Sequence, residues 1–320
     1  MLVTPRSLTR AGLDVVPELE PLRRSGFELV AGPVGRAPAE EELLELVPGC
    51  VGWLAGVERI SARVLAAAGD LRVLSRNGTG TDAVDVAAAE RLGIEVRRAA
   101  GANAQGVAEL TLALALACLR HLPWSGASLR AGGWERWPAR ELDECTIGVV
   151  GVGAVGRRVA ALLTALGATV VASDPFAETS GVEGVPVVGL DDLLRRSDVV
   201  TLHCPPPEDG RPLLDATRLA LVPRGGVLVN TARSALVDDD AVLAALEREA
   251  LSAYAVDAFD VEPPALTPLL RNERVLATPH VGAYTSASVR RATSQAVRGI
   301  LEVLGAAPHD ERPEGCEVVR

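Results

Sequence analysis

The chain has 320 residues, of which 48% are apolar, and its formal net charge at pH 7 is −10. This composition can form two hydrophobic cores, and the acidic charge disfavours nucleic acids and anionic membranes as partners. All 32 basic residues are arginines, which excludes a Schiff-base lysine and the lysine of a phosphate-binding P-loop.

Strand and helix patterns alternate along most of the chain. The first hundred residues indicate a smaller α/β unit, and from about residue 70 short apolar runs predict strands. These strands cover 72–75, 94–98, 146–153, 168–174, 198–204, 225–232, 252–259 and 274–280. The helical patterns cover 102–122, 154–166, 190–196, 238–249 and 286–304. Several strands are apolar almost throughout, so the alternation predicts parallel sheets with right-handed crossover helices.

The stretch TIGVVGVGAVGRRVAALLTALGATVVASD has the pattern of a dinucleotide-binding unit. A strand precedes a G-x-G-x-x-G loop, a helix follows it, and a second strand ends at Asp174, about 20 positions later. The predicted phosphate-binding loop consists of Gly151, Gly153, Ala154, Val155 and Gly156. Gly151 permits the tight turn, Gly153 lets the pyrophosphate approach the backbone, and Gly156 lets helix and strand pack closely. Asp174 should bind the ribose hydroxyls and repel a 2′-phosphate. Residues 175–180 contain no Arg, so NAD is the predicted cofactor.

Only four histidines occur, and one of them, His280, closes a predicted strand in the segment TPHVGAY. A histidine at such a position is either a structural residue or a side chain that exchanges protons near neutral pH. The other three are weaker candidates. His203 ends another predicted strand, and His121 ends a long apolar helix. His309 lies in the Pro- and charge-rich tail 305–320, which we expect to be loosely structured.

Six segments of the chain, taken in order, match the motifs of one family. They are NGTGTDAVD (77–85), GVGAVG (151–156), ASDP (172–175), NTARSALVDDDAV (230–242), VDAFDVEPP (256–264) and TPHVGAY (278–284). With them the chain resembles the D-isomer-specific 2-hydroxyacid dehydrogenases, in particular the D-3-phosphoglycerate dehydrogenase branch, over nearly all residues up to 304. The resemblance implies an α/β protein of two Rossmann-like domains with doubly wound parallel sheets. It also implies an NAD-dependent oxidoreductase with a catalytic Arg–Glu–His set, here Arg233, Glu262 and His280.

The reduction of a 2-oxo acid explains these residue types. The cofactor supplies a hydride to the carbonyl carbon, and a group that titrates near neutral pH supplies the proton to the oxygen. His280 suits that role, and the neighbouring carboxylate of Glu262 would orient the ring and favour its protonated form. Arg233 can bind the substrate carboxylate through its planar donor fork. The three residues follow predicted strands of one parallel sheet, whose carboxyl ends meet at the same edge.

The resemblance also implies further contacts. For the substrate it implies the loop 77–80, with Asn77, Gly78 and Thr79, whose N–H groups would bind the carboxylate. Arg76, just before this loop, would add positive charge. For the cofactor it implies Cys204, Pro205, Thr231, Asp257 and Gly282. Asp257 would bond the nicotinamide carboxamide, and a buried structural acid is the alternative at this position. An ordinary glycine-rich turn is the alternative for 77–80.

The same resemblance divides the chain into domains. The substrate-binding domain is expected to be discontinuous, comprising 1–102 and 284–320, and the NAD-binding domain to comprise 103–283. The two would close on the substrate and exclude water. The helix 103–121 and the tryptophan-rich arm 124–137 would form the interface of a homodimer, since buried aromatic residues are common interface anchors.

Departures from the phosphoglycerate dehydrogenases leave several substrates in view. The stretch that usually contains a phosphate-binding Arg reads VGWLAGVERI (51–60), and Ser234-Ala235 replaces the usual Gly-Gly. The expected substrate is a small anionic 2-oxo or 2-hydroxy acid that is phosphoglycerate-like, or alternatively phosphonopyruvate, hydroxypyruvate or glyoxylate. In the formate-oxidising relatives a Gln pairs with the histidine, so Glu262 argues against formate as the substrate. The phosphite-oxidising relatives use a Lys, so the absence of lysine argues against phosphite. A dinucleotide-sensing binding protein of the same superfamily is the other alternative.

Other features concern location and metals. No stretch of about 18 apolar residues is free of charges and helix breakers, so we expect no membrane span. The first residues, MLVTPRSLTRAG, lack the apolar segment of a signal peptide. The five cysteines contain no C-x-x-C pair, so we expect neither a metal site nor a disulfide framework, which favours a cytoplasmic protein.

Overall fold

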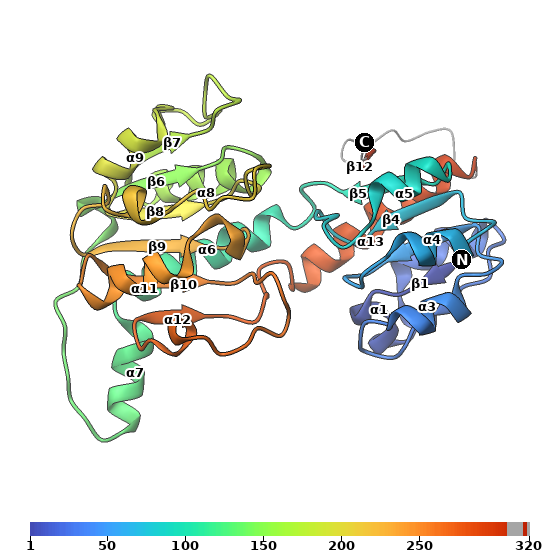
Figure 1. Cartoon of the computed structure of the whole chain (residues 1–320), viewed down its shortest axis with the longest axis horizontal. Coiled ribbons are helices and arrows are strands. Elements are labelled where there is room, and N and C mark those ends of the chain that lie inside the picture. Colours follow the sequence, from blue (N-terminus) through green and yellow to red (C-terminus); the bar gives the residue numbers. More distant parts are fainter. Residues whose placement is uncertain (306–315, 319–320) are drawn as a thin grey trace. The chain divides into compact units, whose positions relative to one another are not determined.

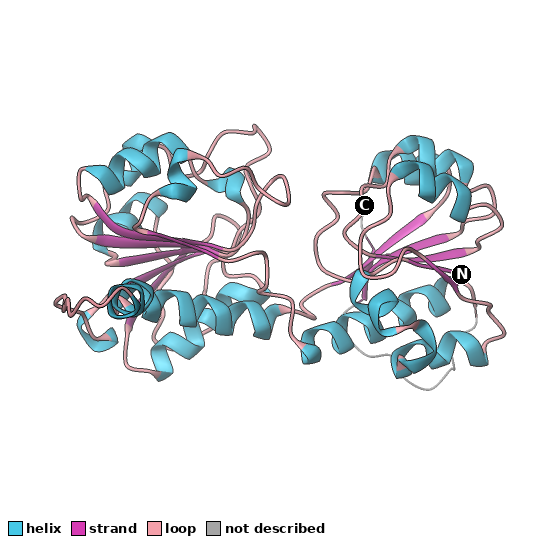
Figure 2. Ribbon diagram, turned by 90° about the horizontal axis from the view of Figure 1, so that it is seen from below, coloured by secondary structure: helices cyan, strands magenta, loops and turns pink. Residues whose placement is uncertain are grey.

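The structure of the protein is a computed structural model that describes residues 1–305 and 316–318. The chain folds into two compact units, each with its own sheet (Figure 1). Unit 1 comprises Met1–Asn103 and Thr285–Arg320, and unit 2 comprises Ala104–Tyr284. In each unit, helices cover both faces of the sheet (Figure 2), which explains why most strands are apolar almost throughout.

The sheet of unit 1 has the strand order β2-β1-β3-β4-β5-β12. Its strands are β1 (Leu2–Val3), β2 (Val30–Ala31), β3 (Gly52–Ala55), β4 (Val73–Arg76), β5 (Glu95–Ala99) and β12 (Cys316–Val318). The first five pair in parallel, in the doubly wound order 2-1-3-4-5. β12 pairs antiparallel with β5 and so bonds the backbone of that edge strand.

Two apolar clusters hold this sheet between helices. One face packs against α3 (Glu40–Leu46), α4 (Ala62–Ala67) and α5 (Val86–Arg91). The other packs against α1 (Arg6–Ala11), η1 (Leu13–Val15), η2 (Pro17–Leu19), α2 (Glu20–Arg24) and α13 (Ser286–Val303). Ala296 and Ile300 of α13 are fully buried in the second cluster. The helix therefore returns from near the end of the sequence to complete the core of unit 1.

The sheet of unit 2 has the order β7-β6-β8-β9-β10-β11, and all its pairings are parallel. Its strands are β6 (Thr146–Val150), β7 (Thr169–Ser173), β8 (Val199–Leu202), β9 (Gly226–Asn230), β10 (Leu251–Val256) and β11 (Val275–Ala277). The winding reverses between β6 and β8. The topological switch point, where such sheets bind ligands, is therefore next to the glycine-rich loop after β6.

The helices of unit 2 also form two layers. One face of the sheet packs against α6 (Ala104–Leu119) and α8 (Ala154–Ala165). The other packs against α9 (Leu190–Arg196), α10 (Ala216–Leu219), α11 (Asp239–Glu247) and α12 (Pro268–Arg271). The remaining helices are α7 (Leu122–Arg130), η3 (Leu142–Glu144) and η4 (Ser234–Leu236). In β6, Ile147 and Val149 belong to the first cluster and Val150 to the second, so both faces of the strand must be apolar.

The predicted α/β class with two parallel sheets is confirmed, with corrections. β12 is antiparallel and lies in the tail that we expected to be loose, whereas 306–315 and 319–320, with His309, fall outside the described residues. The strands β1, β2 and β3 were not predicted individually, because the first two have only two residues each. In unit 2 the predicted strands extend too far at their carboxyl ends. β6 ends at Val150 because Gly151 has φ = +92°.

The apolar pattern over 102–122 forms two helices rather than one. α6 ends at Leu119, and α7 begins at Leu122 at an angle of 60° to it. His121 lies at the junction with φ = +52°. In the described chain, no single helix is long and apolar enough to cross a membrane. The bent pair of α6 and α7 would qualify only by length and composition, a test that buried core helices also pass.

Candidate active site

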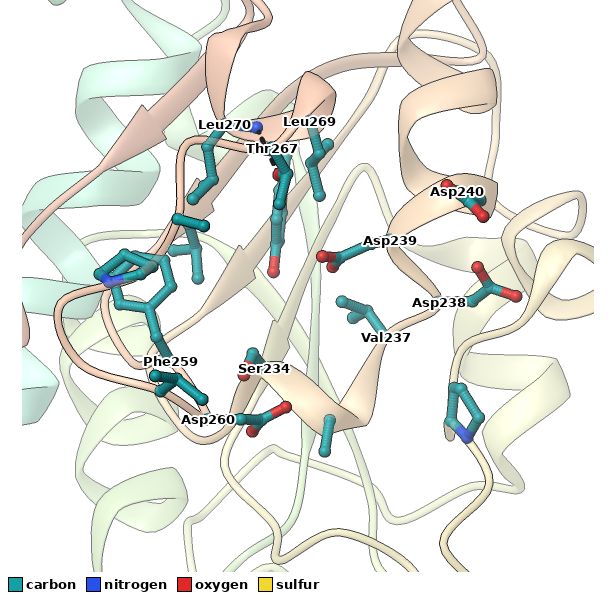
Figure 3. Close-up of a pocket in the computed structure, with 17 residues that line it drawn as sticks. Ser234, Val237, Asp238, Asp239, Asp240, Phe259, Asp260, Thr267, Leu269 and Leu270 are labelled. Carbon is teal, nitrogen blue, oxygen red and sulfur yellow. Dashed lines mark hydrogen bonds between the residues drawn. The ribbon is translucent and has the colours of Figure 1, made fainter.

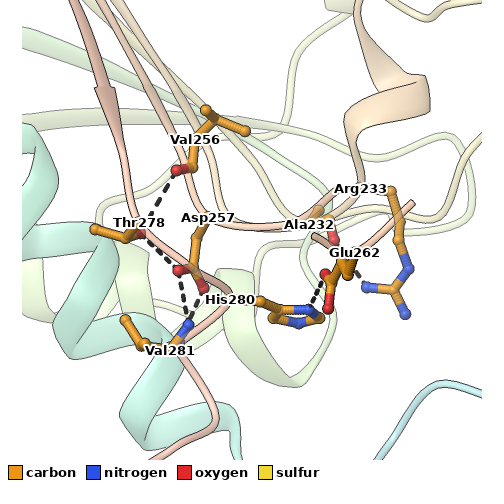
Figure 4. Close-up of polar contacts among 9 residues, drawn as sticks. Ala232, Arg233, Val256, Asp257, Glu262, Thr278, His280 and Val281 are labelled. Atoms are coloured by element: carbon orange, nitrogen blue, oxygen red, sulfur yellow. Dashed lines mark hydrogen bonds and ion pairs between the residues drawn. The ribbon is translucent and has the colours of Figure 1, made fainter. Parts of the chain in front are cut away.

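Arg233 lies in the turn after β9, at the carboxyl edge of the sheet in unit 2. Asn230, the last residue of β9, is fully buried, and its side-chain amide holds this turn. Its Nδ2 donates to the carbonyl O of Arg233 at 2.8 Å, and its Oδ1 accepts from the N–H of Ala232 at 3.1 Å. The guanidinium of Arg233 donates through Nη1 to the carbonyl O of Ala232 at 2.7 Å (Figure 4). The buried amide of Asn230 therefore fixes the backbone from which the Arg233 side chain extends.

His280 and Glu262 are in contact at the same edge of the sheet. Glu262 lies in the loop after β10, and His280 follows β11, which pairs in parallel with β10. Nδ1 of His280 and Oε1 of Glu262 are 2.5 Å apart (Figure 4). The two side chains are 40% and 35% exposed. A carboxylate at Nδ1 favours the tautomer with a proton on that nitrogen, which leaves Nε2 to exchange a proton with a substrate.

The buried carboxylate of Asp257 holds the segment that contains His280. Asp257 is 1% exposed. Its Oδ1 accepts from the hydroxyl of Thr278 at 2.6 Å and from the N–H of Val281 at 2.8 Å, and its Oδ2 accepts from the N–H of Gly282 at 2.8 Å. These bonds fix the chain on both sides of His280, whose φ of +51° is uncommon for a non-glycine residue. The predicted contact of Asp257 with the nicotinamide stays a prediction.

The glycine-rich loop between β6 and α8 depends on two close contacts. A Cβ on Gly156 would lie 1.9 Å from the carbonyl O of Gly151, so only glycine fits there. A Cβ on Gly151 would lie 2.7 Å from the carbonyl O of His203, where the chain leaves β8. At Gly153, by contrast, a Cβ would have no neighbouring atom within 4 Å. This open space is where a pyrophosphate is expected to approach the backbone.

The start of α8 fits the phosphates of NAD, and the end of β7 fits its ribose. The N-cap of α8 is Gly153, which has no side chain to bond the first N–H groups of the helix, and such groups bind phosphate. Asp174 follows β7, and its carboxylate accepts from the N–H of Val152 and the N–H of Phe176, each at 2.9 Å. Two backbone bonds therefore hold the carboxylate beside the loop. Its remaining lone pairs suit the hydroxyls of a ribose.

His203, Cys204 and Pro205 follow β8 beside the same loop. Burial lowers the pKa of His203 to about 3, and its Nε2 lies 2.9 Å from Oγ1 of Thr201, so the ring is neutral at physiological pH. Burial raises the pKa of Cys204 to about 11, so its side chain is a thiol rather than a thiolate. Neither side chain can act as an acid or base near neutral pH.

Three residues that support the site were not predicted. Asn230 holds the turn of Arg233, and Arg157 of α8 donates through Nε to the carbonyl O of Val152 at 2.7 Å. Thr111 of α6 bonds the hydroxyl of Thr231 at 2.9 Å. The partners of Thr111 and Arg157 become close only in the folded chain, and no sequence pattern identifies them. Asn230 did have a signal, because Asn often bonds the backbone two residues further on.

In unit 1, the segment Asn77–Gly80 follows β4 and is held by side chains. Arg76 is 8% exposed, and its Nε donates to the carbonyl O of Gly80 at 2.9 Å. The hydroxyl of Thr79 donates to Oδ1 of Asn103 at 3.0 Å. These contacts give the loop a defined shape. Its predicted role in binding the substrate carboxylate, and that of Arg76, stay predictions.

Comparison with known proteins identifies the family of the chain. Residues 112–282 match the family model described as "D-isomer specific 2-hydroxyacid dehydrogenase, NAD binding domain". The chain belongs to this family. The matched residues lie within unit 2 and include the glycine-rich loop, Arg233 and His280. The chain is therefore an NAD-dependent dehydrogenase of this family.

Individual relatives differ in the substrate that they are named for. The hydroxypyruvate reductase of Thermotoga maritima is 34% identical over 272 residues, which cover 83% of this chain and 89% of the relative. The D-3-phosphoglycerate dehydrogenase of Methanocaldococcus jannaschii is 36% identical over 273 residues, covering 83% of this chain and 52% of the relative, so the dehydrogenase spans about half the length of that protein. The crystal structure of D-lactate dehydrogenase from Aquifex aeolicus, complexed with NAD and lactic acid, is 27% identical with a TM-score of 0.79, covering 95% of this chain and 96% of that chain.

Gly156→Ala should destabilise the dehydrogenase, because the new Cβ would overlap the carbonyl O of Gly151. We expect the free energy of unfolding, measured by urea titration, to fall by about 2 kcal/mol or more. Gly153→Ala is the matched control, since its Cβ meets open space and should change that free energy by less than about 0.5 kcal/mol. It should nevertheless weaken NADH binding about tenfold or more, because the Cβ stands where the pyrophosphate approaches. Equal stabilities for the two variants would contradict the predicted overlap.

Asp257→Asn should loosen the segment around His280, because an amide NH₂ would face an N–H or O–H donor. We expect the amide hydrogens of Val281 and Gly282 to exchange about tenfold faster or more, since each loses a bond to a charged acceptor. Hydrogen exchange with mass spectrometry measures this. Asp198→Asn is the control, because Asp198 also accepts a backbone N–H, that of Thr146. If both variants leave this segment equally protected, Asp257 does not hold it.

Proposed function

We propose that the protein interconverts a small 2-oxo acid and the corresponding D-2-hydroxy acid, with Arg233, Glu262 and His280 as its catalytic residues. The observation that supports this most directly is the 2.5 Å contact between Nδ1 of His280 and Oε1 of Glu262. The three loops that contain these residues leave adjacent parallel strands. Asn230, Val256 and Ala277, the last residues of β9, β10 and β11, stand in one register row. The loops therefore begin at the same level of the sheet.

Each residue has one task in this proposal. When bound, NADH supplies the hydride. Arg233 binds the substrate carboxylate through its guanidinium and orients the carbonyl group. His280 in its protonated form gives the Nε2 proton to the carbonyl oxygen, and in the reverse direction neutral His280 accepts it. Glu262 keeps the imidazole oriented and stabilises its positive charge.

We propose a small anionic 2-oxo acid as the substrate, and several side groups are candidates. The relatives named above support hydroxypyruvate, 3-phosphohydroxypyruvate and pyruvate, and the departures in 51–60 and at Ser234-Ala235 add phosphonopyruvate and glyoxylate. The deciding experiment follows NADH absorbance with each of these five acids. Turnover with at least one supports the proposal. NADH binding without turnover of any of them would contradict it and favour the dinucleotide-sensing alternative.

We further propose a homodimer in the cytoplasm. Four large apolar side chains of α7 and the arm 124–137 are exposed to solvent: Leu122, Leu129, Trp134 and Trp137. Trp134 is 79% exposed, which is unusual for the largest apolar side chain and typical of an interface residue. A second copy of the chain is the proposed partner of this surface.

His280→Ala should lower kcat by about 10²–10⁴-fold in both directions, the usual contribution of general acid–base catalysis. Initial rates of reduction and of oxidation, compared between the variant and the unmodified dehydrogenase, test this expectation. His121→Ala is the control and should keep the normal rate, since the His121 ring bonds the carbonyl O of Pro138 and contacts Trp124 and Trp137 instead of the catalytic loops. A His280→Ala variant with normal turnover would refute the assignment.

The dehydrogenase should prefer NADH to NADPH by about 100-fold in kcat/KM, because the Asp174 carboxylate would repel a 2′-phosphate. Asp174→Ala should lower the ratio of kcat/KM for NADH to kcat/KM for NADPH to about tenfold or less. Arg157, whose guanidinium lies against Val152 and Gly181, is the nearby cation that could then attract the phosphate. Asp192→Ala, an exposed acid on α9, is the charge-matched control and should leave the ratio unchanged. Equal kcat/KM values for the two cofactors in the unmodified enzyme would contradict the role of Asp174.

A further inference from the structure

The loop 77–80 in unit 1 presents consecutive backbone N–H groups that have no hydrogen-bond acceptor in the described chain. The N–H of Asn77 donates to the carbonyl O of Ala55 at 2.9 Å. The N–H groups of residues 78–80, by contrast, donate to no backbone or side-chain oxygen of the described residues. All three residues are partly exposed. Consecutive N–H groups in a turn bind anions, so the loop is suited to the carboxylate of a 2-oxo acid.

Side chains from distant parts of the sequence hold both ends of this loop. At one end, the hydroxyl of Thr293 in α13 donates to Oδ1 of Asn77 at 3.2 Å, and Thr293 is fully buried. At the other end, the hydroxyl of Thr79 donates to Oδ1 of Asn103 at 3.0 Å. The partners of these two bonds are 216 and 24 positions apart in the sequence. The loop therefore keeps its shape only while α13 and the segment around Asn103 stay in place.

The middle of the loop is bonded to the end of β5. The carbonyl O of Gly78 accepts from the N–H of Ala99 at 3.0 Å. This carbonyl and the N–H of Thr79 belong to the same planar peptide group. An anion on the N–H of Thr79 polarises that peptide group and strengthens its bond to Ala99. Binding at the loop therefore stabilises the segment 99–103, which leads out of β5.

Both anchors belong to segments that enter or leave unit 1. Asn103 is the last residue of the first segment of this unit, and Thr285 begins the second segment and caps α13. Arg291 of α13 joins the two segments, because its Nε donates to the carbonyl O of Ala102 at 2.8 Å. A small apolar cluster packs at this point, formed by Ala99, Ala102 and Ala292. The loop, the segment 99–103 and the start of α13 are thus one connected assembly.

We propose that Thr293 and Asn103 are positioning residues for the 2-oxo acid, and that Arg291 couples binding of the acid to both places where the chain passes between the units. Held by these two side chains, the loop has its N–H groups in place before the carboxylate arrives, which lowers the entropy cost of binding. The bound carboxylate then stabilises the segment 99–103 and, through Arg291, the first turns of α13. The inference rests on the proposed function in one respect, that its ligand is a 2-oxo acid.

Thr293→Val tests the positioning role, because it removes the hydroxyl and nearly keeps the shape of the side chain. We expect KM for the preferred oxo acid to rise about fivefold, the loss of one hydrogen bond, with kcat within about twofold of normal. Thr293→Ser keeps a hydroxyl and should restore most of the affinity. Ser294→Ala, at an exposed position of α13, is the control and should leave KM unchanged.

Asn103→Ala is a second variant for the other end of the loop, and it should also raise KM about fivefold. Asn103 is partly exposed, so this variant should fold even if the buried position 293 does not accept Val. An unchanged KM in Asn103→Ala, or a KM that rises equally in Thr293→Val and Thr293→Ser, would overturn the positioning role. A side chain that only supports the fold would lower the thermal midpoint and leave KM unchanged.

Hydrogen exchange with mass spectrometry tests the coupling without turnover. The probe is oxamate, an analogue of pyruvate that NADH does not reduce, added to the complex with NADH. We expect amide exchange over 99–103 and 285–292 to slow about threefold or more in the unmodified protein. In Arg291→Ala the protection of 285–292 should be lost, whereas Arg290→Ala, which changes the neighbouring exposed arginine, is the control and should keep it. Exchange that does not slow in the unmodified protein, or protection of 285–292 that survives in Arg291→Ala, would overturn the coupling.

The two measurements separate this inference from the proposed function. Protection by oxamate in a protein that turns over none of the five acids would refute the proposed function and leave the coupling standing. Turnover without protection of 99–103 would refute the coupling and leave the proposed function standing.

Discussion

The parallel register of β9, β10 and β11 is the constraint on which the proposed site depends. Asn230, Val256 and Ala277 stand in one row at the carboxyl edge of the sheet, so the chain leaves all three strands at the same level. Arg233 and His280 each lie three residues beyond that row, and Asp257 lies one residue beyond it. A slip of one strand by a single residue would turn its side chains to the other face and remove one member of the site.

The carboxylates of unit 2 fall into two classes with different consequences. Asp257 is buried and accepts three hydrogen bonds, so its charge is stabilised and holds the backbone around His280. Asp239 and Asp260, at the start of α11 and in the loop after β10 (Figure 3), are exposed instead, and desolvation together with the charge of Asp260 raises the pKa of Asp239. A buried carboxylate with several donors is structural, whereas an exposed carboxylate interacts mainly with solvent and with its charged neighbours.

The two histidines that follow strands of this sheet show how environment separates similar residues. His203 bonds Thr201, and burial lowers its pKa so far that it stays neutral. His280 is 40% exposed and contacts the carboxylate of Glu262. Only the second combines access to a ligand with a partner that stabilises a positive ring. The difference arises from the loop after β10. This loop contains Glu262, which lies 18 residues before His280 in the sequence.

The sequence by itself determined the α/β class, the glycine-rich loop with Asp174 and the Arg–Glu–His set as a hypothesis, because these depend on local patterns and on motif order. It could not identify the short strands β1 and β2, the antiparallel strand β12 or the carboxyl ends of the longer strands, where apolar residues continue into loops. Only the tertiary structure showed that Asp257 holds the segment of His280, that Asn230 holds the turn of Arg233, and that Asp260 faces the start of α11. The physical reason is the same in each case: hydrogen bonds and charge repulsion depend on distances between side chains, and residues far apart in sequence become neighbours only when the sheet brings their loops together.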